Sequence, residues 1–394
     1  MRARGLEPPR AFAQRVLNPP RLPVPPHPRG AGHRLACARV SVGFRLERQH
    51  LRQPAAAGAH VEVARRLCGL HAQVMSSADL QLRARVEGHT GDELARALWE
   101  ERTLVKTWLM RGTLHAVPAE DLALFTGALD NRGEYAGAWL RAFGVTAKQM
   151  EALIDAIGSS LDGVCLTREE LVARVEQCVG RSFTKRLRSG WGEFLKPAAR
   201  RGVLCFGPSQ GQNVTFVRPD QWVRAKRPLP REEARTELLR RFLAAYGPAT
   251  REDFQRWLGS QRTVPEAWAG LADEVVEVEP KRFALAADQR ALRTRAAGVQ
   301  LLPGFDPFVL FPHSDRPVPP EHLERVYRKA AWISATVVER GRVIGVWTFT
   351  KRGRTVELDV EQFEPFADRT RSAVAREACS VARYLGGDLE LTWR

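Results

Sequence analysis

The sequence predicts an α+β protein made of three tandem winged helices followed by a small C-terminal β-barrel. Two observations lead to this fold class. A pattern of three helices, a β-type run, a turn and a second β-type run occurs three times between residues 44 and 297, and the residues from 298 onward change to closely spaced alternating runs. Three helices followed by a two-stranded hairpin is the winged-helix arrangement.

The first 43 residues form a separate segment that is rich in proline and arginine. They hold eight of the 25 prolines. Because proline lacks a backbone donor and disfavours helix at the preceding residue, we expect residues 1–43 to be a disordered extension. A nucleic-acid-binding arm, a linker and a misassigned translation start all remain open for it.

The first repeat covers residues 44–160. The capping-box pattern Thr90-Gly-Asp-Glu93 predicts the start of its third helix, because the hydroxyl and the carboxylate can satisfy the free N–H groups there. A turn at Arg111-Gly112 separates its two β-type runs. Its predicted helices and strands, in order, are 61–70, 79–86, 93–101, 104–110 and 113–117.

The second repeat covers residues 161–228. A further capping box, Thr167-Arg-Glu-Glu170, predicts a helix that continues to about Gln177. A third helix and two strands around a polar wing follow, at 191–200, 203–206, 214–217 and, for the wing, 207–213.

The third repeat covers residues 229–297 and the last region covers residues 298–394. Five or more strands in under a hundred residues predict a small barrel for the last region. The predicted elements of the third repeat are 231–246, 250–258, 264–271, 274–278 and 282–286. Those of the last region are strands at 300–302, 308–311, 331–339, 343–350 and 355–360, a helix at 369–385 and a strand at 388–393.

An excess of basic residues predicts a polyanionic partner. The formal charge is +16, and residues 44–394 retain +9 after the arginine-rich first 43 residues are set aside. A basic chain of this kind most often binds nucleic acid. From the residues alone, a DNA-binding protein without catalysis is the leading interpretation.

Motifs and composition argue against several other classes. The six cysteines are scattered, with neither a Cys-x-x-Cys pair nor a Cys/His cluster, which disfavours a disulfide scaffold and a structural zinc site. Walker A, Gly-x-Ser-x-Gly, His-Glu-x-x-His and dinucleotide fingerprints are absent from the sequence. No run approaches the roughly 18 apolar residues of a membrane span, and no apolar signal region is present. We expect a cytoplasmic, nucleoid-associated protein with no metal and no cofactor.

Six blocks carry a resemblance to a known family. They are Gly69–Val74, Leu82–Arg85, Lys106–His115, Trp191–Phe206, Leu301–Asp306 and Gly345–Trp347. In this order they resemble the AlkZ/YcaQ family of bacterial DNA glycosylases, over roughly residues 44–394. The resemblance implies three winged helices around a concave DNA-binding channel with a C-terminal β-barrel. It also implies an enzyme of base excision repair that acts on double-stranded DNA containing alkylated purines.

The family's catalytic element is a Gln-x-Gln or Gln-x-Asp triplet, and it matches His71-Ala72-Gln73 in this sequence. The resemblance therefore assigns catalysis to His71 and Gln73, although the first position departs from the usual glutamine. Triplets with histidine first resemble the AlkZ-like branch of antibiotic-producing actinobacteria, which is associated with self-resistance to bulky DNA-alkylating natural products such as trioxacarcin-like compounds. This implies bulky, cationic N7-alkylguanine or other purine adducts as substrates.

The spacing of the triplet places a condition on the backbone. Residues two positions apart on a regular helix point about 200° apart, so His71 and Gln73 can face one ligand only if the helix predicted over 61–70 ends or distorts there. The sequence Ser76-Ser-Ala-Asp79 directly after the triplet is typical of a helix stop and a new cap. We expect the two side chains to converge at such a helix end.

The residue types suit hydrolysis of a cationic nucleoside. An N7-alkylated purine leaves as a neutral base, so the reaction needs a positioned water more than a strong acid. Gln73 can orient this water through its amide oxygen, and a neutral His71 can accept the water proton. Neither side chain is an amine that forms a Schiff base, so we expect a monofunctional glycosylase without lyase activity. A bulky adduct need not enter a tight pocket, so base flipping is not assumed.

Further candidates come from the same blocks and from the charge pattern. His115 either helps shape the active site or is a buried strand histidine, and Asp306, between Phe305 and Pro307, is expected to be a turn or capping residue. Basic residues near the triplet, on the helix predicted at 191–200 and at the tip of the last hairpin are expected to contact DNA. They are Arg83, Arg85, Lys106, Arg111, Lys196, Arg200, Arg201, Lys351, Arg352 and Arg354.

Three alternatives remain at this stage. A winged-helix regulator without catalysis would read an operator as a dimer, although the sequence offers no obvious dimerisation helix, and a monomer is expected. A glycosylase for small lesions such as N7-methylguanine, or for interstrand crosslinks, would use the same triplet. Histidine at its first position leans away from the crosslink specialists, which have two glutamines, but it does not decide between these enzymes.

Overall fold

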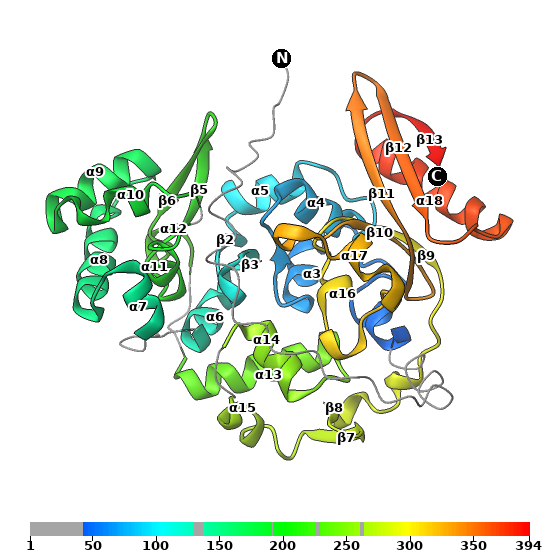
Figure 1. Ribbon diagram of the computed structural model, residues 1–394, viewed down its shortest axis with the longest axis horizontal. Coiled ribbons are helices and arrows are strands. Elements are labelled where there is room, and N and C mark those ends of the chain that lie inside the picture. The colour runs from blue at the N-terminus through cyan, green and yellow to red at the C-terminus, as the bar shows by residue number, and fades with distance from the viewer. Residues whose placement is uncertain (1–41, 130–134, 136, 191, 225–228, 261–263) are drawn as a thin grey trace.

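The computed structural model describes most of the chain from residue 42 onward, and the extension predicted at 1–43 falls almost entirely outside the described residues. Figure 1 shows the first repeat in the middle of the molecule, the second repeat and the C-terminal sheet at opposite ends, and the third repeat below. Helices and strands are mixed throughout, as the predicted α+β class requires. The described residues are 42–129, 135, 137–190, 192–224, 229–260 and 264–394.

The first repeat is a helical cluster against a three-stranded antiparallel sheet of order β1-β3-β2. The helix predicted over 61–70 ends earlier, at Arg66, because Cys68 and Gly69 turn the chain with positive φ values of 54° and 105°. The chain then enters a short strand, which changes the geometry of the triplet. The elements are α3 (His60–Arg66), β1 (Leu70–His71), α4 (Met75–Arg83), α5 (Glu93–Trp99), β2 (Leu104–Trp108) and β3 (Leu114–Pro118).

Helices α6 (Leu122–Leu129), α7 (Gly137–Phe143) and α8 (Ala147–Ser160) lead to the second repeat. The capping box at Thr167 is confirmed: its hydroxyl accepts from the Glu170 N–H, and the Glu170 carboxylate accepts from the Thr167 N–H. The second repeat has a three-stranded sheet of order β4-β6-β5, and residues of α8 form part of its hydrophobic core. The remaining elements are β4 (Leu166–Thr167), α9 (Arg168–Val179), α10 (Thr184–Leu187), α11 (Lys196–Arg200), β5 (Cys205–Gln210), β6 (Asn213–Val217) and α12 (Pro219–Trp222).

The third repeat follows its predicted elements closely. A capping box that joins Thr250 and Asp253 starts α14, and α13 packs on α6 in a core shared with the first repeat. Its elements are α13 (Arg231–Tyr246), α14 (Arg251–Leu258), α15 (Pro265–Ala269), β7 (Val275–Glu279) and β8 (Arg282–Leu285).

The predicted C-terminal barrel is wrong, because the described strands form an open five-stranded sheet of order β13-β12-β11-β10-β9. The apolar face of α18 covers the sheet through buried Val374, Ala378 and Val381, so closure is not needed to bury it. The strand predicted at 308–311 is instead helical, since Asp306 caps it and Pro307 occupies its first turn. The elements are β9 (Val299–Leu302), α16 (Pro307–Leu310), α17 (Leu323–Val326), β10 (Ala335–Glu339), β11 (Arg342–Arg352), β12 (Thr355–Gln362), α18 (Asp368–Tyr384) and β13 (Asp388–Trp393).

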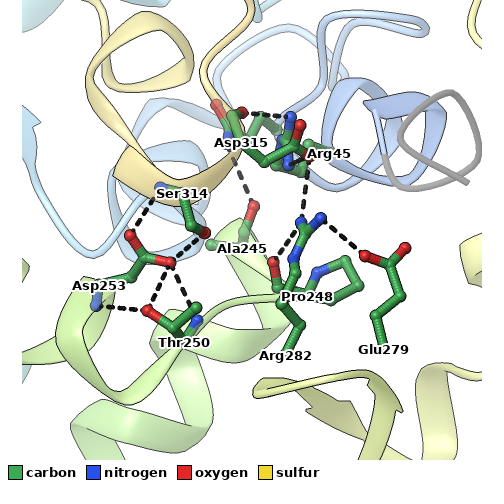
Figure 2. Close-up of polar contacts among 10 residues, drawn as sticks. Arg45, Ala245, Pro248, Thr250, Asp253, Glu279, Arg282, Ser314 and Asp315 are labelled. Atoms are coloured by element: carbon green, nitrogen blue, oxygen red, sulfur yellow. Dashed lines mark hydrogen bonds and ion pairs between the residues drawn. The ribbon is translucent and has the colours of Figure 1, made fainter. Parts of the chain in front are cut away.

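A polar network ties the third repeat to the C-terminal region (Figure 2). Asp315 pairs with Arg45 at 2.7 Å and with Arg282 at 3.1 Å. The Asp253 carboxylate, which caps α14, also accepts from the Ser314 N–H at 2.9 Å. These contacts join the third repeat to Arg45 and to the residues around Asp315. Within the described residues no helix is long and apolar enough to cross a membrane.

Candidate active site

The triplet lies between β1 and α4 and not at the end of the helix predicted over 61–70. His71 ends β1, where it pairs with His115 in β3, and the Ala72 N–H donates to the Leu114 carbonyl at 2.8 Å. Gln73 lies in a bend two residues before α4. The His71 ring contacts the His115 ring, and the Gln73 amide oxygen accepts from the Leu114 N–H. The two side chains are therefore brought together by their contacts with the start of β3.

His71 is held firmly by its neighbours. Its ring lies parallel to the Phe305 ring, with centroids 5.1 Å apart, and meets the edge of the His115 ring at 5.5 Å. Its backbone N–H donates to the Gln81 amide oxygen at 3.1 Å, and its carbonyl accepts from the Gln81 amide nitrogen at 3.0 Å. The side chain is only 6% exposed. This packing fixes the imidazole in one orientation.

Both histidines of the site are neutral. Burial, together with the nearby charge of Arg111, lowers the pKa of His71 to about 3. The same two causes lower the pKa of His115 well below its usual value. His115 Nδ1 lies 3.0 Å from the Thr113 carbonyl and Nε2 lies 3.3 Å from an Arg111 amino group. These partners require the tautomer in which Nδ1–H donates and Nε2 accepts.

Gln73 is the exposed member of the pair. Its amide oxygen accepts from the Leu114 N–H at 3.4 Å, at the start of β3. An amide oxygen has two lone pairs, so it can accept from a water as well. Within the described part of the chain the Gln73 amide nitrogen has no hydrogen-bond partner. The exposed amide therefore lies beside the buried imidazole with hydrogen-bonding capacity to spare.

A buried ion pair is connected to the residues that hold His71. Arg85 and Asp306 are both fully buried, and two bonds of 2.7 and 2.8 Å join them. The Arg85 guanidinium also donates to the backbone carbonyl of Gln81, whose side chain holds the His71 backbone. Asp306 directly follows Phe305, which stacks on His71. The ion pair thus links Gln81, which binds the His71 backbone, to the segment that carries Phe305, which stacks on the His71 ring.

Asp306 has the capping role predicted for it, since its carboxylate accepts from the Phe308 N–H at 3.0 Å. The sequence reasoning missed Phe305 and Gln81 as site residues. Phe305 belongs to a block of the family resemblance, but no local pattern indicates that it reaches His71. Gln81 reads as an ordinary helix residue on α4.

Four arginines predicted to bind DNA are committed to other parts of the protein. Arg85 is fully buried against Asp306, and Arg83 donates to Ser380 and Glu377 on α18. Arg201 binds Glu151 and Tyr135, and Arg111 donates to the Trp257 carbonyl at 2.6 Å. Since their donors are used internally, the structure does not support DNA contacts for Arg83, Arg85, Arg111 and Arg201.

The other six basic residues remain available. Lys106, Lys196 and Arg200 are partly buried, and the described residues give none of them a carboxylate within ion-pair distance. Lys196 and Arg200 lie against the turn at Gly112, where a Cβ would be 3.4 Å from each side chain. Lys351, Arg352 and Arg354 are exposed at the tip of the β11–β12 hairpin. The Lys351 ammonium donates to the Leu385 carbonyl, and the two arginines make long contacts of 3.5 and 3.7 Å to Glu357 and Asp388.

The described residues contain no group of three or more histidine, cysteine, aspartate or glutamate side chains placed to hold a metal ion. The triplet itself contributes an imidazole and an amide. This pair can position a water and support a developing positive charge through lone pairs and ring dipoles.

Comparisons with known proteins identify the family of this chain. The family model for the AlkZ-like DNA glycosylases matches residues 64–384. An interstrand DNA cross-link repair glycosylase of Streptomyces sahachiroi is 40% identical over 364 residues, which cover 87% of this chain and 95% of that protein. The solved structure of the Streptomyces sahachiroi DNA glycosylase AlkZ matches with a TM-score of 0.81 and 36% identity, covering 90% of this chain and 98% of that one. The chain therefore belongs to the AlkZ-like family and is a DNA glycosylase.

Proposed function

We propose that this glycosylase is monofunctional and hydrolyses the N-glycosidic bond of bulky, cationic N7-alkylguanine or other purine adducts, in self-resistance to a DNA-alkylating natural product. The observation that carries the proposal is the placement of His71 and Gln73 together against the start of β3, with a neutral histidine in first position. Membership in the family sets aside the non-catalytic regulator that the sequence left open.

In this proposal Gln73 holds the attacking water. Loss of a neutral purine leaves an oxocarbenium-like sugar, which needs a water placed on its open face. The exposed Gln73 amide accepts a hydrogen bond from this water while the Leu114 N–H fixes the side chain. Positioning of this kind lowers the entropy cost of the attack.

The role of His71 differs from that of a strong general base. With a pKa of about 3 its ring stays neutral at pH 7 and is a weak base. A water that has added to the sugar is itself strongly acidic, so a weak acceptor suffices to take its proton. We therefore assign His71 two tasks, orienting the water and lending lone-pair density to the developing cation.

A Schiff-base mechanism would need an accessible amine at the site. Burial lowers the pKa of Lys106 to about 8, which makes it the lysine to consider. In the sheet, His115 is paired with His71 on one side and with Thr107 on the other. Lys106 precedes Thr107 on β2 and is paired with Ala116. Adjacent strand positions point to opposite faces, and the Lys106 ammonium lies 5.2 Å from the Phe206 ring. This placement supports hydrolysis without lyase activity.

Double-stranded DNA is proposed to contact the hairpins and their flanking cations, with the protein acting as a monomer. The β5–β6 and β11–β12 hairpins extend the same way at the two ends of the molecule (Figure 1). The helical repeats would act as winged helices that hold the backbone through Lys106, Lys196, Arg200, Lys351, Arg352 and Arg354.

A second candidate substrate is an interstrand crosslink. The 40% identical Streptomyces sahachiroi protein is described as an interstrand DNA cross-link repair glycosylase. A crosslink between guanine N7 atoms is chemically two cationic N7-alkylpurines, so the same water and the same two residues would cut it.

The test is a gel assay of strand scission after alkali or heat. Three duplexes are compared, carrying N7-methylguanine, a bulky N7-guanine adduct or an N7–N7 crosslink. We expect Gln73→Ala to reduce excision by at least about 100-fold while DNA affinity changes little, because positioned proton acceptors contribute on that scale. Gln177→Ala, an exposed glutamine on α9, is the matched control and should behave as wild type.

The pattern of products separates the candidates. Excision of the bulky adduct alone supports the proposal, and unhooking of the crosslink supports the second candidate. Equal activity of Gln73→Ala and wild type would remove the triplet from the mechanism, and strand scission without alkali would contradict a monofunctional enzyme.

A further inference from the structure

A tight surface loop packs against Phe305, the residue that stacks on His71. The loop, Arg328–Trp332, has exposed residues throughout, and the Trp332 side chain is 51% exposed. Large apolar side chains rarely remain exposed without a partner. In the part of the chain that the structure describes, Leu229 is the other exposed large apolar residue.

The loop is built to hold the indole outward. Ala330 and Ala331 both have positive φ values, 57° and 58°, a backbone conformation that side chains rarely adopt. The Arg328 N–H donates to the Trp332 carbonyl at 2.8 Å and closes the loop at its base. Consecutive strained residues persist where the surrounding structure fixes them, and they occur often at binding sites.

The inner edge of Trp332 reaches the catalytic residues through one side chain. Its ring meets the Phe305 ring edge-on at 5.0 Å, and Phe305 stacks on His71 at 5.1 Å. Gly304 has no room for a side chain, since a Cβ there would lie 2.8 Å from the Ile333 carbonyl. The loop is therefore pressed against the segment that holds the imidazole.

The outer part of the loop is cationic. Arg328 and Lys329 are exposed, and neither forms an ion pair with the described residues. Two free cations beside an exposed aromatic ring are the groups that bind a nucleic-acid strand, since the cations bind phosphates and the ring stacks on a base.

We propose that Trp332 is a stacking residue of the active site. Its indole stacks on a planar aromatic ring of the damaged strand, while Arg328 and Lys329 bind flanking phosphates, so that the scissile sugar is presented to His71 and Gln73. The inference rests on the proposed catalytic roles of those two residues. The planar ring is either a nucleobase beside the lesion or the aromatic part of a bulky adduct.

Affinity and single-turnover excision of Trp332→Ala test the proposal on two duplexes, one with N7-methylguanine and one with a bulky planar N7 adduct. We expect about tenfold weaker binding or more, the scale found when a stacking aromatic is removed. Trp332→Phe keeps a stacking ring and should stay within about threefold of wild type. A loss on both duplexes assigns the ring to a nucleobase, and a loss on the planar adduct alone assigns it to the adduct.

The controls separate this inference from the proposed catalytic roles. Leu229→Ala removes the other exposed apolar side chain and should bind as wild type. Gln73→Ala should lose excision and keep affinity, whereas Trp332→Ala should lose affinity, so each hypothesis fails on a different measurement. The Arg328→Ala, Lys329→Ala double variant should lower the slope of log affinity against log salt by about two.

Two results would overturn the inference. One is wild-type affinity and excision by Trp332→Ala on both duplexes. The other is a Trp332→Phe variant that is as impaired as Trp332→Ala and melts at a lower temperature, because the tryptophan would then serve the fold alone. Quenching of wild-type fluorescence by DNA that is absent in Trp332→Phe would support stacking directly.

Discussion

The first and second repeats each contain a two-stranded hairpin, but the two hairpins are used differently. The anchored hairpin, β2–β3, turns at Arg111, whose φ is 57° and whose guanidinium donates to the Trp257 carbonyl and lies 4.6 Å from the Phe311 ring. The free hairpin, β5–β6, has an exposed tip at residues 209–213. Of the two, the anchored hairpin contacts the triplet, through His115 and the Leu114 N–H.

The difference shows what each hairpin needs for its task. Catalytic groups must be held within a fraction of an ångström, so their supporting strand is fixed between the second and third repeats. A hairpin that grips a duplex gains from an exposed tip, because the tip must reach the DNA backbone. In this proposal the same supersecondary unit serves as a catalytic support in one repeat and as a binding element in the other.

The largest expected effect comes from loosening the anchored hairpin with Arg111→Ala. The change leaves the Trp257 carbonyl and His115 Nε2 without their donor, and bonds to a buried charged group contribute about 1.5–3 kcal/mol each. We expect unfolding free energy to fall by about 3 kcal/mol and excision to fall by more than about tenfold, measured by denaturant unfolding and single-turnover assay.

The matched variant in the second repeat is Arg218→Ala, next to the free hairpin. Arg218 pairs with Asp162 and Asp220 at the surface, and such pairs contribute less than about 1 kcal/mol. Equal losses from Arg111→Ala and Arg218→Ala would show that the two hairpins are not anchored differently.

A smaller effect is expected from a pair of glycine substitutions. Gly259 and Gly211 both have positive φ, 77° and 60°, so alanine at either costs about 1 kcal/mol. Only at Gly259 would the new Cβ lie 2.6 Å from the backbone of Arg111, whereas nothing lies within 4 Å at Gly211. Gly259→Ala should therefore destabilise the protein by about 2 kcal/mol more than Gly211→Ala, and it should also slow excision. Identical melting curves for the two variants would contradict the anchoring contact.

The smallest effect concerns pH. Because burial and Arg111 hold the pKa of His71 at about 3, its ring should not titrate between pH 5.5 and 8. The rate of single-turnover excision should vary by less than about twofold over this range. A fall in the rate centred near the unperturbed histidine pKa of about 6.5 would contradict the assignment of a neutral His71.

The lowered pKa of His71 should also make the free energy of unfolding depend on pH. The unfolded chain takes up a proton on His71 below about pH 6.5, but the folded protein resists it until about pH 3. The contribution of His71 is therefore complete above pH 6.5 and is lost progressively as the pH falls toward 3. His71→Gln lacks this titration, so wild type should lose stability relative to the variant when unfolding is measured at pH 5 instead of pH 7.5.

Local sequence signals located most helices and strands. The capping box at Thr167 located the start of α9, and alternation located the β11–β12 hairpin to within about two residues. The errors have local causes as well. Phe308 reads as strand, but Asp306 and Pro307 before it start a helical turn, and the predicted helix at 61–70 overlooked that Gly69 permits a turn.

The triplet was found by resemblance to a family, and its geometry came only from the fold. Pairing with His115, 44 positions away by number, turns the predicted helix end into a strand. Among the ten basic residues proposed for DNA, sequence position could not distinguish free side chains from paired ones. Arg85 meets Asp306 221 residues along the chain, and Arg83 meets Glu377 294 residues along it.

The sequence by itself determined the repeated helical units, their hairpins and the basic character, because caps, periodicity and charge act over a few neighbouring residues, whereas the triplet was identified by the family resemblance. The tertiary structure alone decided that His71 and Gln73 both contact the start of β3, that four arginines are internal and that Trp332 lies beside Phe305. The physical reason is that burial and pairing depend on which distant segments pack together, and a local pattern carries no record of its distant partners.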